Sequence, residues 1–189
     1  MTYKTDLYED YRGEVGVLTA IDTRNNSIKT LFKDSDNSQF FVQGRYGIRF
    51  IDNNWYEFLG FKGSLYRVDL KSGAHQRMAS TDALGRSWLI DPNGAIAAQS
   101  IFDTRSGDWV VKANGRELIH KTSPLHDYYL RGFSNSTDAV LVQDETGASP
   151  RLFELSIAAD APPRELWSDF DWRYTLHSRS GLLLSLIHI

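Results

Sequence analysis

Residues 65–73 read LYRVDLKSG, and their pattern is repeated along the chain. Apolar and polar side chains alternate in its first half, as they do in a strand with one buried face, and its Lys-Ser-Gly end is typical of a turn. The same pattern occurs earlier as LTAIDTRNN at residues 18–26, and the two copies align without a gap. The matching positions are Leu18 with Leu65, Ile21 with Val68, Asp22 with Asp69, and Arg24 with Lys71.

Two further apolar strands that end in turn residues continue the series at residues 109–115 and 152–157. The four strands begin at residues 18, 65, 109 and 152, so they recur at intervals of 47, 44 and 43 residues. A strand-rich unit that recurs every 40 to 50 residues is typical of a β-propeller blade. We therefore predict an all-β chain, a β-propeller fragment with about four blades of four antiparallel strands each.

The repeat divides the chain into blades and predicts where the strands turn. We place the partial propeller at residues 1–183 and its blade-like repeats near residues 14–37, 38–80, 81–122 and 123–168. The strongest turn signal is Asp91-Pro92-Asn93-Gly94, because proline fixes φ and Asn-Gly accepts a positive φ. Residues 1–12 are predicted to be an outer strand of a blade whose start is missing, and residues 168–183 to be the exit from the repeats.

The last six residues, LSLIHI at positions 184–189, resemble the translation of an adaptor used in sequencing-library preparation. We expect them to be non-native and exclude them from fold reasoning, so His188 receives no role. We also expect the natural protein to continue beyond Leu183.

The composition excludes several classes of protein. A net charge of -3 argues against a nucleic-acid partner, which would require a basic surface. The chain contains no cysteine, which excludes disulfides, thiolate catalysis and cysteine-bound zinc. No apolar run approaches the roughly 18 residues of a membrane span, and no glycine-rich phosphate loop predicts a cofactor. The compartment stays open between cytoplasm and periplasm.

The motifs of a serine hydrolase are also missing from the sequence. The nearest match to Gly-x-Ser-x-Gly is GFSNS at residues 132–136, which has serine in place of the second glycine and falls at a predicted hairpin. We interpret Ser134 as a turn residue. The stretch Ser178-Arg179-Ser180-Gly181 fails in the same way, so no catalytic residue is predicted.

Other chemically active residues are interpreted as structural, and none is assigned as a metal ligand or cofactor contact. No pair of histidines has a metal-binding spacing, so these side chains are placed in strands and loops; they are His75, His120, His126 and His177. The turn aspartates are predicted to accept backbone N–H groups; they are Asp22, Asp52, Asp69, Asp91 and Asp103. The tryptophans are predicted to pack the blades, although propeller mouths also use aromatic residues for ligands; they are Trp55, Trp88, Trp109, Trp167 and Trp172.

Three stretches resemble the N-terminal propeller of prolyl oligopeptidase-family serine peptidases: residues 65–73, WLIDPNG at residues 88–94, and FDTRSGDW at residues 102–109. The resemblance covers about residues 14–183. It implies a propeller that caps a C-terminal α/β-hydrolase domain carrying a Ser-Asp-His triad. In that family the propeller filters peptide substrates, and no triad motif is present in this chain.

Two functions therefore follow from the sequence. The first is the non-catalytic propeller of a peptidase, with the missing hydrolase domain and a peptide substrate as its partners. The alternative is a binding or scaffold propeller, Tol-associated or WD40-like, without enzymatic activity. A third hypothesis, a carbohydrate-active propeller, requires carboxylates on the inner strands, where this chain is mainly apolar.

Overall fold

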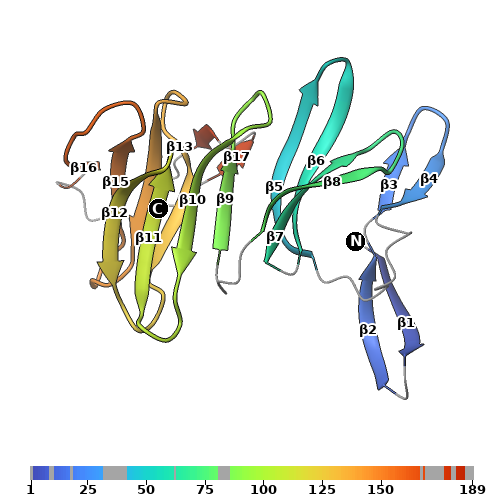
Figure 1. Ribbon diagram of the computed structural model, residues 1–189, viewed down its shortest axis with the longest axis horizontal. Coiled ribbons are helices and arrows are strands. Elements are labelled where there is room, and N and C mark those ends of the chain that lie inside the picture. The colour runs from blue at the N-terminus through green and yellow to red at the C-terminus, as the bar shows by residue number, and fades with distance from the viewer. Residues whose placement is uncertain are drawn as a thin grey trace. The chain divides into compact units, whose positions relative to one another are not determined.

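The computed structural model describes residues 2–8, 11–17, 19–31, 42–61, 63–80, 86–166, 168, 177–179 and 182–185, and every regular element in these ranges is a β-strand (Figure 1). The chain divides into two compact units, residues 1–81 and residues 82–189. The predicted all-β class is confirmed, and the two units are described separately below.

The first unit contains one complete four-stranded sheet and two hairpins. The sheet is antiparallel, with its strands adjacent in chain order. Its strands are β5 (Val42–Ile51), β6 (Asn54–Phe61), β7 (Ser64–Asp69) and β8 (His75–Ser80). The hairpins are β1 (Thr2–Tyr8) with β2 (Tyr11–Val17), and β3 (Thr19–Asp22) with β4 (Ser27–Thr30).

The second unit contains two four-stranded antiparallel meanders, the second of them extended by two short strands. The first meander comprises β9 (Arg86–Ile90), β10 (Ile96–Phe102), β11 (Asp108–Ala113) and β12 (Arg116–Thr122). The second comprises β13 (Tyr128–Phe133), β14 (Ala139–Asp144), β15 (Arg151–Ser156) and β16 (Arg164–Leu166). Strands β18 (Leu182–Ser185) and β17 (His177–Arg179) follow β13 in this sheet.

The apolar core of the second unit lies between its two meanders. Trp109 on β11 is stacked on Tyr128 of β13, with ring centroids 5.5 Å apart. One cluster of buried side chains joins both sheets, including Val111 from the first and Phe133 and Val140 from the second. Face-to-face packing of neighbouring sheets through alternate side chains is how the blades of a propeller bury their apolar surface.

The turns form where the sequence predicts them. The N–H of Gly94 donates to the carbonyl oxygen of Asp91 at 3.1 Å, and Gly94 has a φ of 85°. Asp69 behaves as predicted for a turn aspartate, since its carboxylate accepts the N–H groups of Lys71 and Ser72 at 2.7 and 2.8 Å. Asp22, Asp91 and Asp103 accept turn N–H groups in the same way.

Three local predictions require correction or lie outside the described residues. Trp109 and Trp88 are buried as predicted, but Trp55, near the tip of the β5–β6 hairpin, is half exposed among the described residues. Trp167 and Trp172 lie outside the described residues. Residues 1–12 do not form a single outer strand, because β1 and the start of β2 both fall within them.

The chain after residue 168 is also not a simple exit from the repeats. Strand β18 returns to the sheet and pairs in parallel with β13, with Leu182 opposite Phe133. The limits assigned to the four repeats, and the non-native origin of residues 184–189, stay predictions.

Candidate functional site

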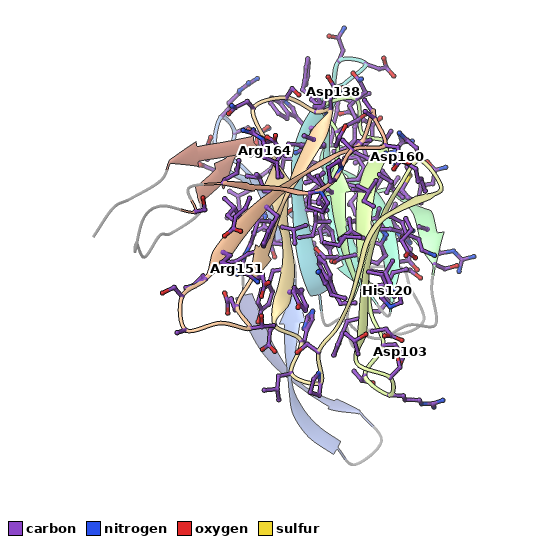
Figure 2. All side chains as sticks on the ribbon, turned by 90° about the vertical axis from the view of Figure 1, so that its left-hand side faces the viewer. Asp103, His120, Asp138, Arg151, Asp160 and Arg164 are labelled. Atoms are coloured by element: carbon purple, nitrogen blue, oxygen red, sulfur yellow. The ribbon has the colours of Figure 1, made fainter. Side chains whose placement is uncertain are left out.

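Three connections of the second unit meet at one end of its sheets: residues 103–107, residues 123–127 and residues 145–150. The N–H of Ser123 donates to the carbonyl oxygen of Gly107 at 2.9 Å, which joins the first connection to the second. The N–H of Glu145 donates to the carbonyl oxygen of Asp127 at 2.8 Å, which joins the second to the third. Figure 2 shows Asp103 and Arg151 at this lower end and Asp138 and Asp160 at the opposite end.

The middle connection holds His126 in an unusual backbone conformation. Its φ is 56°, in the left-handed region that non-glycine residues adopt at an energetic cost. The hydroxyl of Ser123 donates to the carboxylate of Asp127 across the same connection, and the N–H of Leu125 donates to that hydroxyl at 3.4 Å. These bonds fix the loop around His126 and point its ring at the neighbouring strands.

The ring of His126 is the centre of a continuous stack, which we call the aromatic row: Phe102, His126, Tyr129 and Arg131. The imidazole lies nearly parallel to Phe102, with ring centroids 4.4 Å apart and 15° between planes, and meets Tyr129 at 5.4 Å. The guanidinium carbon of Arg131 lies 4.4 Å from the centroid of the Tyr129 ring. Such a cation over an aromatic face is attractive, and stronger where solvent is excluded.

Two acceptors, Gln143 in β14 and Glu145 directly after it, hold Arg131 in place. Its Nε donates to Gln143 Oε1 at 2.7 Å, and its Nη2 lies 3.3 Å from Glu145 Oε1. An equivalent arrangement occurs in the first unit, where Arg45 Nε donates to the buried Glu57 Oε1 at 2.6 Å, again 12 residues away. Each of these two sheets therefore anchors an arginine of its first strand to an acceptor of its second.

A buried carboxylate, Asp144, lies in the chain between Gln143 and Glu145, the two acceptors of Arg131. Asp144, at the end of β14, accepts the N–H and hydroxyl of Thr146 at 2.9 and 2.6 Å and pairs with Arg151 at 2.7 Å. Burial by itself raises the pKa of Asp144, but the hydrogen bonds from Thr146 and Arg151 outweigh burial, so the pKa lies below its ordinary value of 3.8.

We predict an acid-induced loss of stability from Asp144. Because its folded pKa is depressed, its contribution is complete above the unfolded pKa near 3.8 and is lost as the pH falls through the lower folded value. Asp144→Asn should lower the free energy of unfolding by about 1–2 kcal/mol at pH 7 and flatten its decline below pH 4. Urea unfolding between pH 2.5 and 7 measures both, and equal pH slopes for the two proteins would contradict the prediction.

The serine hydroxyls near this unit's loops are engaged by carboxylates. Ser134 is a turn residue as predicted, since its N–H closes the β13–β14 connection by donating to Ala139 at 2.9 Å. Its buried hydroxyl donates to Glu154, which also accepts from Arg164 at 2.7 Å. The bonds from Ser134 and Arg164 lower the pKa of Glu154, which keeps this carboxylate ionised and a poor general base.

Two other histidines with described side chains, His120 and His75, make contacts of their own. His120 on β12 lies 3.2 Å from Asp108 and 3.8 Å from Glu117 on an exposed strand pair. Hydrogen bonds from Ser106, Thr122 and His120 lower the pKa of Asp108. His75 meets Tyr66 edge to face at 6.0 Å. Among the residues with described side chains, no cluster of histidine and carboxylate groups has the geometry of a metal site.

The sequence alone did not predict the aromatic row, because His126 was interpreted only as a structural residue of a strand or loop. Phe102, His126 and Tyr129 are spread over 28 sequence positions, and only the pairing of two sheets brings them together. A usable signal was the position of Phe102 and Tyr129 beside predicted turns, where rings at the ends of neighbouring sheets can meet; Phe102 itself is buried in the core. Histidine is, with asparagine and aspartate, among the non-glycine residues enriched at positive φ, but that tendency alone does not single out His126.

Comparison with solved structures identifies the architecture. The crystal structure of TolB from Acinetobacter baumannii aligns with 87% of this chain and 41% of its own, at 16% identity and a TM-score of 0.51. A protein assigned as TolB from Agrobacterium tumefaciens aligns with 89% of this chain and 65% of its own, at 15% identity and a TM-score of 0.51. Both are β-propeller proteins. The fold is a β-propeller.

This propeller spans less than two thirds of the length of either TolB structure. No family model matches the chain, and no curated protein matches it significantly. The similarity establishes the fold, and the prolyl oligopeptidase resemblance stays a prediction. Within the described residues, no helix is long and apolar enough to cross a membrane.

Proposed function

We propose that this chain is a binding propeller that recognises a peptide segment of a partner protein through the aromatic row and has no hydrolytic activity of its own. The observation that carries the proposal is the stack of Phe102, His126, Tyr129 and Arg131 at the end where three connections meet. The strained backbone of His126 supports it, because strained residues cluster at ligand-contacting sites.

The chemistry of the site suits a peptide. Tyrosine and arginine dominate the binding energy of protein interfaces, because each combines a large flat contact area with hydrogen-bond donors. Leu125, which precedes His126 in the chain, is 79% exposed and offers an apolar contact. Glu145, which is exposed, supplies an acceptor for backbone or side-chain N–H groups. Phe102 is itself buried, so an apolar or aromatic side chain of the ligand would pack on His126, Tyr129 and Arg131, while the ligand backbone bonds to Glu145.

Two serine hydroxyls of the second unit are engaged in a way that does not suit hydrolysis. The described contacts of Ser123 and Ser134 place each hydroxyl as a donor to a carboxylate, Asp127 or Glu154. A serine nucleophile requires a base that takes its proton and is itself oriented, which is usually histidine. The TolB structures support a propeller scaffold for binding.

The test begins with selection of 12-residue peptides from a random display library on the immobilised full chain. Affinities of the selected peptides are then measured by fluorescence anisotropy for the unmodified chain, Tyr129→Ala and Arg131→Ala. Each variant should weaken binding by about 30-fold, the effect of losing a contact worth about 2 kcal/mol.

The matched control is the arginine–tyrosine pair of the first unit, where the guanidinium carbon of Arg67 lies 4.9 Å from the Tyr56 ring. Tyr56→Ala and Arg67→Ala should leave the affinity unchanged. The proposal is wrong if no peptide is enriched, or if the control variants weaken binding as much as the site variants do. Labelling of the chain by a fluorophosphonate would contradict the non-hydrolytic part.

The peptidase resemblance supplies a second candidate function, in which this propeller filters peptides for a hydrolase domain encoded beyond Leu183. Its support is the sequence similarity at residues 65–73, 88–94 and 102–109. Sequencing the source gene across the codon for Leu183 separates the two. A following domain with Gly-x-Ser-x-Gly, then Asp and His, supports the peptidase, and further blades or a stop codon exclude it.

A further inference from the structure

Arg131 and Glu145 form an ion pair that the protein encloses only in part. Their side chains are 35% and 37% exposed, and Arg131 Nη2 lies 3.3 Å from Glu145 Oε1. Gln143 closes a ring of three side chains, since its Oε1 accepts from Arg131 Nε at 2.7 Å and its Nε2 donates to Glu145 Oε1. Both ends of the Gln143 amide are engaged, which fixes the guanidinium and one oxygen of the carboxylate.

The ring leaves one donor and one acceptor unengaged. A guanidinium carries N–H groups on three nitrogens, and a carboxylate accepts through two oxygens. In the part of the chain that the structure describes, Arg131 Nη1 and Glu145 Oε2 make no hydrogen bond. Both atoms belong to partly exposed side chains at the end of the aromatic row, so they are available to a ligand that packs on the row.

The other arginine–carboxylate pair at this end of the sheets is closed. The side chain of Asp144 is only 5% exposed. Its Oδ1 accepts the N–H and hydroxyl of Thr146, and its Oδ2 accepts from Arg151 at 2.7 Å. Both oxygens of Asp144 therefore have partners within the protein, and this pair serves the structure.

A ligand group beside Arg131 and Glu145 meets one positive and one negative group together. A ligand carboxylate would be attracted by Arg131 and repelled by Glu145, and a ligand ammonium group would meet the reverse. An uncharged carboxamide avoids both repulsions, because it carries an acceptor oxygen and an NH₂ donor. Its oxygen can accept from Arg131 Nη1 while its nitrogen donates to Glu145 Oε2.

We propose that the aromatic row recognises an asparagine or glutamine of the ligand, whose side-chain amide bridges Arg131 and Glu145. This inference rests on the proposed function and names the polar residue of the bound segment. Glu145 Oε2 has two lone pairs, so it accepts from this amide in addition to a backbone N–H. The Tyr129 ring, 4.4 Å from the Arg131 guanidinium carbon, provides the apolar contact beside the bridge.

The test uses the 12-residue peptides selected from the random library on the full chain. Each peptide is synthesised as selected and with its asparagine or glutamine replaced by aspartate or glutamate, which keeps the shape and adds a charge. The unmodified chain should bind the amide form about 10-fold more tightly than the acid form, measured by fluorescence anisotropy, because the acid form faces Glu145.

Glu145→Gln removes one of the two charges and keeps the shape of the side chain. Arg131 alone then faces a ligand carboxylate, so this variant should bind the acid form at least as tightly as the amide form. The matched control is Asp103→Asn, which removes a carboxylate at the same end of the sheets, from a turn that asparagine tolerates (Figure 2). It should keep the preference for the amide form.

The outcomes separate this inference from the proposed function. Selected peptides without asparagine or glutamine, equal affinities for the two forms, or an unchanged preference in Glu145→Gln would overturn the carboxamide assignment, even where Tyr129→Ala weakens binding and the peptide site stands. Loss of the preference in Asp103→Asn would also overturn it, since net charge would then set the preference. If no peptide is enriched, or Tyr129→Ala binds as tightly as the unmodified chain, the proposed function fails and this inference fails with it.

Discussion

Trp109→Ala is expected to unfold the second unit at moderate denaturant concentrations. Trp109 is 1% exposed and stacked on Tyr128, in the cluster where side chains of β10, β11, β13, β14 and β15 meet. Removing a buried indole costs its transfer free energy and leaves a cavity, together about 3–5 kcal/mol. That is a large share of the stability of a small domain. Urea unfolding followed by circular dichroism measures the shift in midpoint.

The control is the same substitution at Trp55. This indole is 52% exposed, so Trp55→Ala should lower the free energy of unfolding by no more than about 1 kcal/mol. Equal losses for the two variants would contradict the assignment of Trp109 to the core between two blades.

Gly44→Ala is expected to destabilise the first unit by about 1–3 kcal/mol, the usual cost of forcing an extra methyl group into a packed site. A Cβ at Gly44 would lie 2.5 Å from Tyr46 Oη and 2.7 Å from its Cζ. The Tyr46 ring also lies close to Gly60, where an added Cβ would be within 3.2 Å of it. The ring therefore cannot move away from Gly44 in that direction. The two glycines thus make room for one tyrosine ring. Thermal unfolding reports the loss.

The ionisation of Tyr46 provides an independent readout. Burial raises the pKa of Tyr46 to about 12, from an ordinary value of 10.0. Stability from this neutral phenol is therefore complete below pH 10 and declines as the pH rises toward 12. Gly44→Ala should displace the ring toward solvent and lower this pKa. The titration of Tyr46 is followed by ultraviolet absorbance, as the difference between proteins with Tyr46 and the same proteins carrying Tyr46→Phe.

Gly147→Ala is the matched control for this substitution, since the nearest atom to its added Cβ lies at an ordinary 3.6 Å. It should change neither the thermal midpoint nor the tyrosine titration. An unchanged Tyr46 titration in Gly44→Ala would show that the ring does not rest on Gly44.

Much of the fold follows from local signals in the sequence. Asp91-Pro92-Asn93-Gly94 forms its turn because its side chains and glycine satisfy that backbone locally, and Asp69 caps its turn for the same reason. The apolar residues and the turn that ends residues 65–73 locate β7, in which Leu65 and Val68 are fully buried on opposite faces of the strand. The return of β18 to β13 was not predictable, because it depends on a pairing between residues 49 positions apart, Phe133 and Leu182.

The candidate site was less accessible to sequence reasoning than the fold. Each member of the aromatic row has an ordinary local explanation as a strand or loop residue, and the row exists only once two sheets pack. The half-exposed Trp55 was mispredicted for a related reason: its residue type indicates burial, and its exposure depends on which strand covers β6. Residue type predicts the tendency to be buried, and the neighbouring sheet decides whether burial occurs.

The most direct test of the binding site is hydrogen–deuterium exchange of the full chain with and without a peptide selected on it. We predict that the peptide slows exchange at residues 102–107, 123–131 and 143–151, the segments that form and hold the aromatic row. Slowed exchange confined to other segments, such as the β5–β6 hairpin, or no change at saturating peptide, would contradict peptide binding at the aromatic row.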